Sequence, residues 1–209
     1  MSPPREVGRP QRVAVLHSEA GVRSIRGRGA QGLVSRRARL GAAASNFPTL
    51  PPVDTSKYQH TETVVIAASP AAVYDLVSDI TRMGEWSPVC TAGEWHDDTQ
   101  ASFTGTNTTP DRTWQTKCRV DVADPGVEFA FTNLGMEGDA ELVRWGYTFR
   151  AVDGGTEVTE SWQVLENYDE FLTKLVPGMD VAQYLDGVKP VTQQGMAETL
   201  ANLKAVAES

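Results

Sequence analysis

Residues 63–88 read TVVIAASPAAVYDLVSDITRMGEWSP, and this stretch decides the fold class. The β-branched run VVI at its start predicts a strand. Ser69 and Pro70 then predict the start of a helix, because serine caps the first turn and proline lacks an N–H that this turn does not use. Apolar residues at spacings of three and four give that helix one apolar face: Val73, Leu76, Val77 and Ile80. We expect Gly84 to end the helix and Trp86 to lead into the next strand.

Apolar and polar residues alternate through most of the chain that follows, which predicts antiparallel strands with one buried face. Residues 113–122 show the alternation most clearly, with Trp114, Thr116 and Cys118 on one side and charged or amide residues on the other. The first strand is expected at 61–67. Further strands are expected at 89–95, 101–108, 113–122, 127–133, 141–152 and 156–164, separated by turns such as DPG and DGG.

The pattern becomes helical after residue 167. A short amphipathic segment ends at Pro177-Gly178, and residues 181–188 form at most another turn. Pro190 is a good first helical residue, so we expect it to open the last helix. An apolar stripe runs along that helix through Met196, Leu200 and Leu203. We expect Gly195 to let the helix approach the sheet closely.

Three of these stretches resemble the START-like, or SRPBCC, superfamily, in particular its bacterial polyketide cyclase/dehydrase and lipid-transport branch. They are SPAAVYDLVSDI with the following RMGEWSP, the strand pair within 113–133, and the ending GMAETLANLKAVAES. The resemblance covers roughly residues 58–207 and implies an α+β helix-grip fold. In that fold a curved antiparallel sheet wraps around a long C-terminal helix and leaves an internal cavity. The superfamily includes enzymes, carriers and chaperone co-factors, so the resemblance implies a fold more than a reaction.

The charge of the chain divides it into two parts. Residues 1–55 hold nine Arg and three acidic residues, a net charge of +6, whereas residues 56–209 hold ten basic and 24 acidic residues, a net charge of −14. The first part is rich in Arg, Gly, Ala and Pro and has no structural period, so we expect a disordered tail at 1–55 before one domain at 56–209. A nucleic-acid arm and a targeting peptide are alternative interpretations of the tail. We favour an upstream extension without function, with the cellular protein starting near Val53.

Composition argues against several classes of function. The acidic domain lacks the concentrated basic surface that nucleic acids or anionic membranes require, and no apolar run reaches the roughly 18 residues of a membrane span. Cys90 and Cys118 are too few for a disulfide framework, so a reduced, cytoplasmic protein is expected. No cluster has metal-ligand spacing, and no phosphate-binding or nucleophile motif occurs, so we expect no metal and no cofactor. The oligomeric state is left open.

The inward faces of the predicted strands define a candidate ligand-binding cavity. Its expected lining is Trp86, Phe103, Asn107, Trp114, Thr116, Phe129, Phe131, Trp145, Tyr147, Phe149, Glu160 and Trp162. Ordinary core packing explains any one of these rings. As a set, large rings with few polar groups are typical of a small-molecule site.

Glu160 is the exception in its strand, because an acid stands where the alternation requires an apolar residue. A β-bulge could turn it outward, a partner could hold it in a structural role, or it could be the polar anchor or acid/base group of a site. Tyr147 is the other weak catalytic candidate, although a core tyrosine with its hydroxyl near the rim is the simpler interpretation. Asn107 and Asn133 lie near strand ends, where backbone capping is as good an explanation as ligand binding.

Together these features predict a protein that binds a small hydrophobic ligand, lipid- or polyketide-like, in an internal cavity. The alternative is a cyclase- or dehydratase-type enzyme that uses Tyr147 and Glu160 on a polyketide-like substrate. A third hypothesis is an interaction protein similar to the chaperone co-factors of the superfamily. The absence of an inward His–Asp pair favours the carrier over the enzyme.

Overall fold

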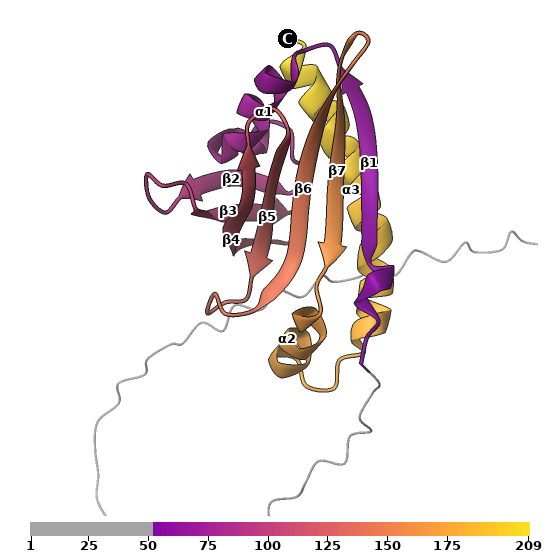
Figure 1. Ribbon diagram of the computed structural model, residues 1–209. Coiled ribbons are helices and arrows are strands. Elements are labelled where there is room, and N and C mark those ends of the chain that lie inside the picture. Colours follow the sequence, from indigo (N-terminus) through magenta and orange to yellow (C-terminus); the bar gives the residue numbers. More distant parts are fainter. Residues whose placement is uncertain (1–51) are drawn as a thin grey trace, which may run out of the picture.

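A computed structural model describes residues 52–209 (Figure 1). The described part consists of seven strands, four short helical segments and one long final helix. In chain order the elements are η1 (Thr55–Lys57), β1 (Gln59–Ile66), α1 (Pro70–Ser78), η2 (Ile80–Glu85), β2 (Cys90–Trp95), β3 (Ser102–Thr109), β4 (Arg112–Asp124), β5 (Glu128–Leu134), β6 (Glu141–Val152), β7 (Gly155–Val164), α2 (Asn167–Leu175) and α3 (Val181–Ala207).

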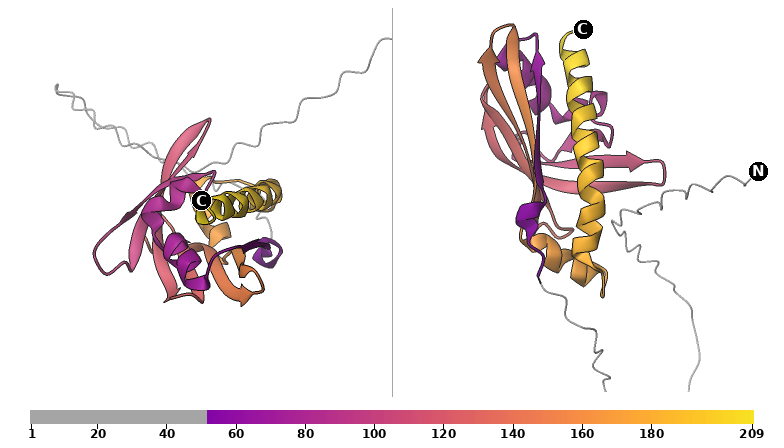
Figure 2. Two further views of the ribbon diagram at one scale, coloured as in Figure 1. Left: turned by 90° about the horizontal axis from the view of Figure 1, so that it is seen from above. Right: turned by 90° about the vertical axis from the view of Figure 1, so that its right-hand side faces the viewer.

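The strands form one antiparallel sheet in the order β1-β7-β6-β5-β4-β3-β2. Two further views show that the sheet curves and that α3 runs along its concave side (Figure 2). Helix α1 and η2 lie at one end of the sheet, and α2 lies at the other end (Figure 1). This arrangement confirms the predicted helix-grip α+β fold.

The alternation of the sequence places the strands within a few residues of their observed bounds, and 141–152 matches β6. In β4, residues of one parity are buried or half-buried from Arg112 to Val122, and residues of the other parity are exposed. In β7 the inward residues Val158, Glu160, Trp162 and Val164 are all buried, whereas the outward residues are half-buried or exposed. The predicted inward faces are therefore the faces that the concave side of the sheet presents to α3.

The expectation that Gly84 ends the first helix is wrong. Helix α1 ends at Ser78, and the Asp79 side chain caps a new 3₁₀ turn by accepting a hydrogen bond from the backbone N–H of Thr81. Gly84 lies inside η2, where a Cβ atom would come within 2.2 Å of the carbonyl oxygen of Thr91. Glycine is needed here because η2 packs directly on the backbone of β2.

The last helix begins nine residues earlier than the sequence predicts. Helix α3 starts at Val181, with Asp180 accepting a hydrogen bond from the N–H of Gln183, and Pro190 lies inside it. The ring of Pro190 is exposed, and the helix continues past it. Because proline has no N–H, the helix has one backbone hydrogen bond fewer at this point. The apolar stripe therefore reaches Leu185, Tyr184 and Val181, which are all buried.

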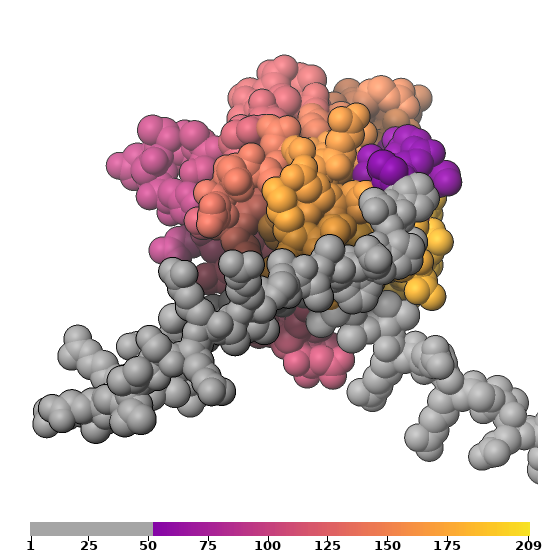
Figure 3. All heavy atoms as spheres, turned by 90° about the horizontal axis from the view of Figure 1, so that it is seen from below, coloured from indigo at the N-terminus to yellow at the C-terminus, as the bar shows by residue number. Residues whose placement is uncertain are grey.

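Two clusters of buried side chains form the core, one towards each end of the sheet. The first joins α1 and η2 to the strands and to Leu200 and Leu203 of α3. The second joins Tyr58, Trp162 and Met196 to α2 and to the start of α3. Seen from below, the orange atoms of α2 and its neighbourhood lie between the purple start of the domain and the strands (Figure 3).

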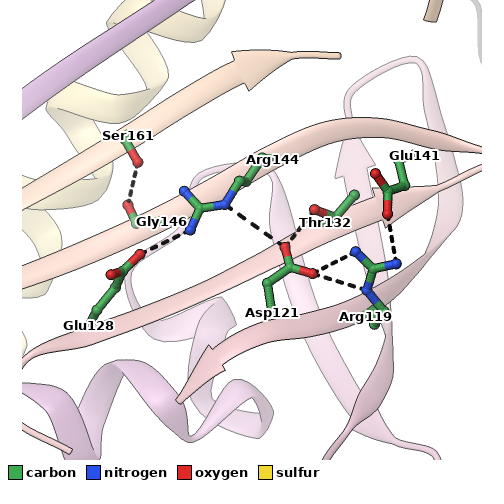
Figure 4. A network of polar contacts seen from close by, with 8 residues as sticks. All are labelled: Arg119, Asp121, Glu128, Thr132, Glu141, Arg144, Gly146 and Ser161. Atoms are coloured by element: carbon green, nitrogen blue, oxygen red, sulfur yellow. Dashed lines mark hydrogen bonds and ion pairs between the residues drawn. The ribbon is translucent and has the colours of Figure 1, made fainter. Parts of the chain in front are cut away.

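Charged side chains cross the outer face of β4, β5 and β6 (Figure 4). Asp121 accepts hydrogen bonds from Arg119 and from Thr132, and Arg144 bridges from Asp121 to Glu128, with the guanidinium 2.9 Å from the Glu128 carboxylate. The network covers Thr132, which is buried although its side chain points outward. The convex face is thus ionic where the concave face is largely aromatic.

Only the last residues of the tail expected at 1–55 can be compared with the structure, because residues 1–51 lie outside the described part. From Val53 onward the chain contacts the domain, and the Val53 N–H donates to a carboxylate oxygen of Asp169 in α2. Within residues 52–209, no helix is long and apolar enough to cross a membrane.

Pro190 supplies the first prediction. Replacing it with Ala should raise the free energy of unfolding by about 1–3 kcal/mol. A helix-interior proline costs about 3 kcal/mol relative to alanine, but proline also restricts the backbone of the unfolded chain, and this offsets part of that cost. Urea denaturation of the full chain measures the change. Pro177→Ala, in the exposed loop before α3, is the control and should stay within about 0.5 kcal/mol of the unsubstituted protein. A destabilised Pro190→Ala protein would contradict a continuous helix through this position.

Candidate ligand-binding site

The structure divides the twelve predicted lining residues by exposure. Eight are buried: Trp86, Phe103, Phe129, Phe131, Tyr147, Phe149, Glu160 and Trp162. Four are half-buried, namely Asn107, Trp114, Thr116 and Trp145. All four lie on β3, β4 and β6.

Most of the buried rings pack against other rings. Phe103 meets Phe131 edge to face with centroids 5.1 Å apart, and Tyr74 of α1 covers both Phe129 and Phe149, at 6.5 Å and 5.8 Å. These contacts belong to the first core cluster, together with Trp86 and Tyr147. For these rings, packing alone accounts for the burial.

Trp162 belongs to the second cluster, beside Tyr58 and Met196. Half-buried Trp145 packs against both clusters, since it faces Phe131 on β5 and Trp162 on β7 across the sheet. The predicted set therefore does not form one continuous lining. It forms two packed regions with Trp145 between them.

The half-buried residues of β3 and β4 lie side by side. Asn107 donates through its amide to the Thr116 hydroxyl at 3.0 Å, so Thr116 has the local partner that strand position suggests. Asn107 also pairs with Trp114 in the register, and the guanidinium of Arg112 lies 4.4 Å from the centroid of the Trp114 ring. Aromatic surface and amide, hydroxyl and guanidinium groups thus meet at the hairpin end of the concave face.

Gly195 faces open space, which corrects the expectation that it brings α3 close to the sheet. A Cβ atom built there meets nothing within 4 Å. One side of α3 contacts β1 through Gln193 and Lys204, whereas Asn202, two helical turns beyond Gly195, reaches the Trp86 carbonyl oxygen at 3.1 Å on the other side. Gly195 shares the side of Asn202, so the space beside it lies on the side of the helix turned away from β1.

Glu160 and Tyr147 are joined in the interior. The Tyr147 hydroxyl donates to Oε1 of Glu160 at 2.7 Å, and the two residues are directly opposite in the β6–β7 register. Glu160 is 2% exposed, and the register runs through it without a bulge, so the outward-facing explanation of this acid is wrong. The expectation that the Tyr147 hydroxyl lies near the rim is wrong as well, because that oxygen is buried.

Burial dominates the electrostatics of this pair. It raises the pKa of Glu160 to about 8, against an opposing effect of the Tyr147 hydrogen bond and with a further rise from the nearby charge of Glu62. Burial and the Glu160 carboxylate hold the pKa of Tyr147 well above its usual value. Near neutral pH Glu160 is therefore mostly a neutral carboxylic acid, and Tyr147 is a neutral phenol.

Glu62 and His60 are neighbours of this pair that the sequence reasoning did not single out. Glu62 faces Glu160 across the β1–β7 register, its carboxylate lies 3.2 Å from Nε2 of His60, and the other ring nitrogen of His60 is 3.2 Å from the Gln193 amide of α3. The signal was present in β1, where His60, Glu62, Val64 and Ile66 share one parity and only the last two are apolar.

Two surface depressions lie largely apart from the predicted lining. One, of about 480 Å³, is on the outer face of β1, β7 and β6, where it is lined by Gln59, His60, Thr61, Arg144, Ser161, Trp162 and Gln163. The other, of about 290 Å³, lies between α1 and the end of α3. Trp162 is the single member of the predicted set that borders either one.

The raised pKa of Glu160 predicts a pH dependence of stability. Between about pH 4.5 and pH 8 the unfolded chain has lost this proton and the folded protein keeps it, so the free energy of unfolding falls as pH rises through that window. At about 1.4 kcal/mol per pKa unit the loss amounts to a few kcal/mol. Glu160→Gln, which keeps the shape and the acceptor for Tyr147, should remove this component. Denaturation at pH 5, 6.5 and 8.5 measures it.

Glu94→Gln is the matched control, because Glu94 is an exposed glutamate of a strand. It should follow the unsubstituted protein at all three pH values. If Glu160→Gln also runs parallel to the unsubstituted protein, Glu160 is already ionised in the folded state and the assignment of a neutral acid fails.

Comparison with known proteins places this geometry in a family. The family model described as polyketide cyclase/dehydrase and lipid transport matches residues 58–208. No curated protein matches the chain. Among solved structures, the Polyketide_cyc-like protein Cgl2372 from Corynebacterium glutamicum is 34% identical, with a TM-score of 0.53, over 72% of this chain and 91% of that one.

Two more distant structures share the fold. The Zhui aromatase/cyclase from Streptomyces sp. R1128 is 15% identical with a TM-score of 0.57, over 72% of this chain and 93% of that one. The di-domain ARO/CYC BexL from the BE-7585A biosynthetic pathway is 20% identical with a TM-score of 0.58, over 73% of this chain and 50% of that one. From the family match and the similarity to Cgl2372, the chain belongs to the polyketide cyclase/dehydrase and lipid-transport family of the SRPBCC superfamily.

Proposed function

We propose that this protein binds a small hydrophobic ligand, lipid- or polyketide-like, between α3 and the concave face of its sheet. The observation that carries the proposal is the open space beside Gly195, on the side of α3 turned away from β1. Strands β3, β4 and β6 offer half-buried Trp114 and Trp145 with Asn107 and Thr116 on the concave face. Concave surfaces that combine aromatic rings with a few polar groups are the usual form of a small-molecule site.

The family supports the same class of ligand. Its description covers cyclases, dehydrases and lipid transport, whose substrates and cargo are largely apolar. Two structures with the same fold are named as aromatase/cyclase or ARO/CYC proteins. We assign the ring-packed residues, such as Phe129 and Phe149, to the floor of the site, and the half-buried residues to contact with the apolar body of the ligand.

An enzymatic role is the second candidate, and the Tyr147–Glu160 pair is the observation that favours it. A carboxylic acid with a pKa of about 8 is poised to exchange a proton near neutral pH. In a cyclase- or dehydratase-type reaction Glu160 would hold and move that proton, while Tyr147 would fix the orientation of the carboxyl group through its 2.7 Å hydrogen bond. Turnover of a polyketide-like substrate, lost in Glu160→Gln, would separate this role from carriage.

The proposal extends to the setting of the protein. Residues 56–209 form the ligand-binding domain, and the protein works in the cytoplasm. The net charge of −14 on residues 56–209 supports a site for a small molecule rather than for nucleic acid. No metal or cofactor is assigned to the site.

Filling the space beside Gly195 tests the proposal. The apolar dye N-phenyl-1-naphthylamine should bind the full chain saturably, and Gly195→Phe should weaken binding about 10-fold or more because the new ring occupies the site. The folded protein should not suffer, since phenylalanine has a better helix propensity than glycine and nothing lies within 4 Å of the new Cβ. Dye fluorescence gives the affinity, and thermal denaturation gives the stability.

Ala197→Phe is the matched control, because Ala197 is an exposed residue of the same helix, two residues along. It should bind the dye as the unsubstituted protein does. Equal affinity in both variants would move the ligand site away from this side of α3. A complete lack of saturable binding would favour a protein-interaction role similar to that of the chaperone co-factors.

A further inference from the structure

The carboxyl group of Glu160 has one oxygen with a partner and one without. Oε1 accepts the hydrogen bond from Tyr147, whereas Oε2 is buried and has no hydrogen-bond partner among residues 52–209. A buried polar atom left without a partner costs about 1–3 kcal/mol. Leucine or valine at this position of β7 would avoid the cost, so the oxygen is available for a group that the folded chain does not itself provide.

The charged and titratable groups around Glu160 do not neutralise it. On β1, Glu62 lies directly across the register, with His60 beside it. On β6 the neighbour is Tyr147, and Cys90 of β2 also raises the pKa of Tyr147. Helix α3 contributes the uncharged amide of Gln193, which lies near His60. Within the described residues no Lys or Arg forms an ion pair with Glu160.

The two oxygens of the neutral acid then have different roles. Burial keeps the carboxyl group protonated near pH 7, as its raised pKa indicates. Because Oε1 already accepts from Tyr147, the proton belongs on Oε2, where it forms an O–H donor without an acceptor. A donor of this kind on the concave face is satisfied by an uncharged oxygen with free lone pairs.

We propose that Glu160, held in orientation by Tyr147, selects apolar ligands that carry a carbonyl oxygen over equally apolar ligands that lack one. This inference rests on the proposed function, because it assigns the chemistry of a ligand in the same site. The O–H of Oε2 donates to the ligand carbonyl, and the Tyr147 hydroxyl prevents the carboxyl group from turning away. Glu160 is thus the specificity-determining residue, and Tyr147 is the positioning residue.

The same geometry disfavours a ligand with an acidic head group at this point. A carboxylate brought to Oε2 would meet Glu160 and, one strand away, Glu62, without a basic side chain paired to either Glu160 oxygen. Burying an ionised head group without a basic partner is costly, and the nearby charge of Glu62 adds repulsion, so an ionised fatty acid is disfavoured at this point. A ketone or an ester makes the hydrogen bond without bringing a charge.

A matched pair of probes tests the selection. 2-Acetylnaphthalene and 2-ethylnaphthalene have nearly the same size and differ in the carbonyl oxygen, and each can displace N-phenyl-1-naphthylamine from the full chain. At pH 6.5 we expect 2-acetylnaphthalene to bind about 5- to 10-fold more tightly, the value of one hydrogen bond in a dry site. The preference should disappear as pH rises through about 8 to 9.5, since the ionised carboxylate has no proton to donate.

Two substitutions separate recognition from structure. In Glu160→Gln the amide oxygen can accept from Tyr147 and the amide N–H can donate to the ligand, so the preference should persist and become independent of pH. Glu160→Leu should bind both probes equally at every pH. A purely structural role of Glu160 moves neither the ratio of the two affinities nor its pH profile.

Each of the other outcomes has a definite meaning. If both probes bind equally to the unsubstituted protein at pH 6.5, or if the preference survives at pH 9.5, the assignment to Glu160 is overturned while the proposed ligand site stands. If neither probe binds, the proposed function itself fails. If the cationic 2-(2-aminoethyl)naphthalene binds more tightly than the ketone, Glu160 acts as an ionised partner of a cation, and the carbonyl proposal is wrong.

Discussion

The contact between α3 and the edge strand β1 is the constraint on which the rest of the structure depends. Lys204 donates to the backbone carbonyl of Val65 at 2.6 Å, and Lys189 donates to that of Lys57 at 2.7 Å. Between them, Gln193 meets His60, and near the start of the helix the Tyr58 hydroxyl donates to Asp186. These contacts cover the β1 edge of the sheet, where unpaired backbone groups could otherwise pair with another chain. They also fix the helix along one side of the concave face, so any free space must lie on its other side.

Much of the fold follows from the periodicity of the sequence. Strict alternation gives the faces of β4 and β7, because every second residue there is less exposed than its neighbours in the strand. The turn DGG sets the register between β6 and β7. Val152 pairs with Gly155 across that turn, so a count of five residues back and five forward brings Tyr147 opposite Glu160. The pair could therefore have been found from the sequence, had the register of the hairpin been counted as well as its faces.

The errors arise where a local rule is overruled by packing. Proline usually begins a helix, yet Pro190 is tolerated inside α3, because buried residues before it, such as Leu185, repay the lost hydrogen bond. Glycine commonly ends a helix, yet Gly84 serves the close approach of η2 to β2. The sequence could not predict which aromatic rings pack in the core and which remain accessible. That difference depends on the position of Tyr74 of α1 over the sheet and on the side of α3 on which Gly195 lies.

Glu160 illustrates how a binding site limits the stability of its fold. A carboxyl group with one unpaired oxygen in a dry interior lowers the free energy of unfolding relative to a well-packed apolar residue, and protonation only reduces that cost. The outer face shows the alternative arrangement, in which Asp121 and Glu128 form ion pairs with Arg119 and Arg144, so each carboxyl group has a basic partner. The chain thus has basic side chains available, and in the described part it places these pairs on the convex face. An acid kept neutral by burial, and oriented by one tyrosine, retains a hydrogen-bond donor that an ion pair would have removed, and this is the physical reason to connect Glu160 with recognition rather than with stability.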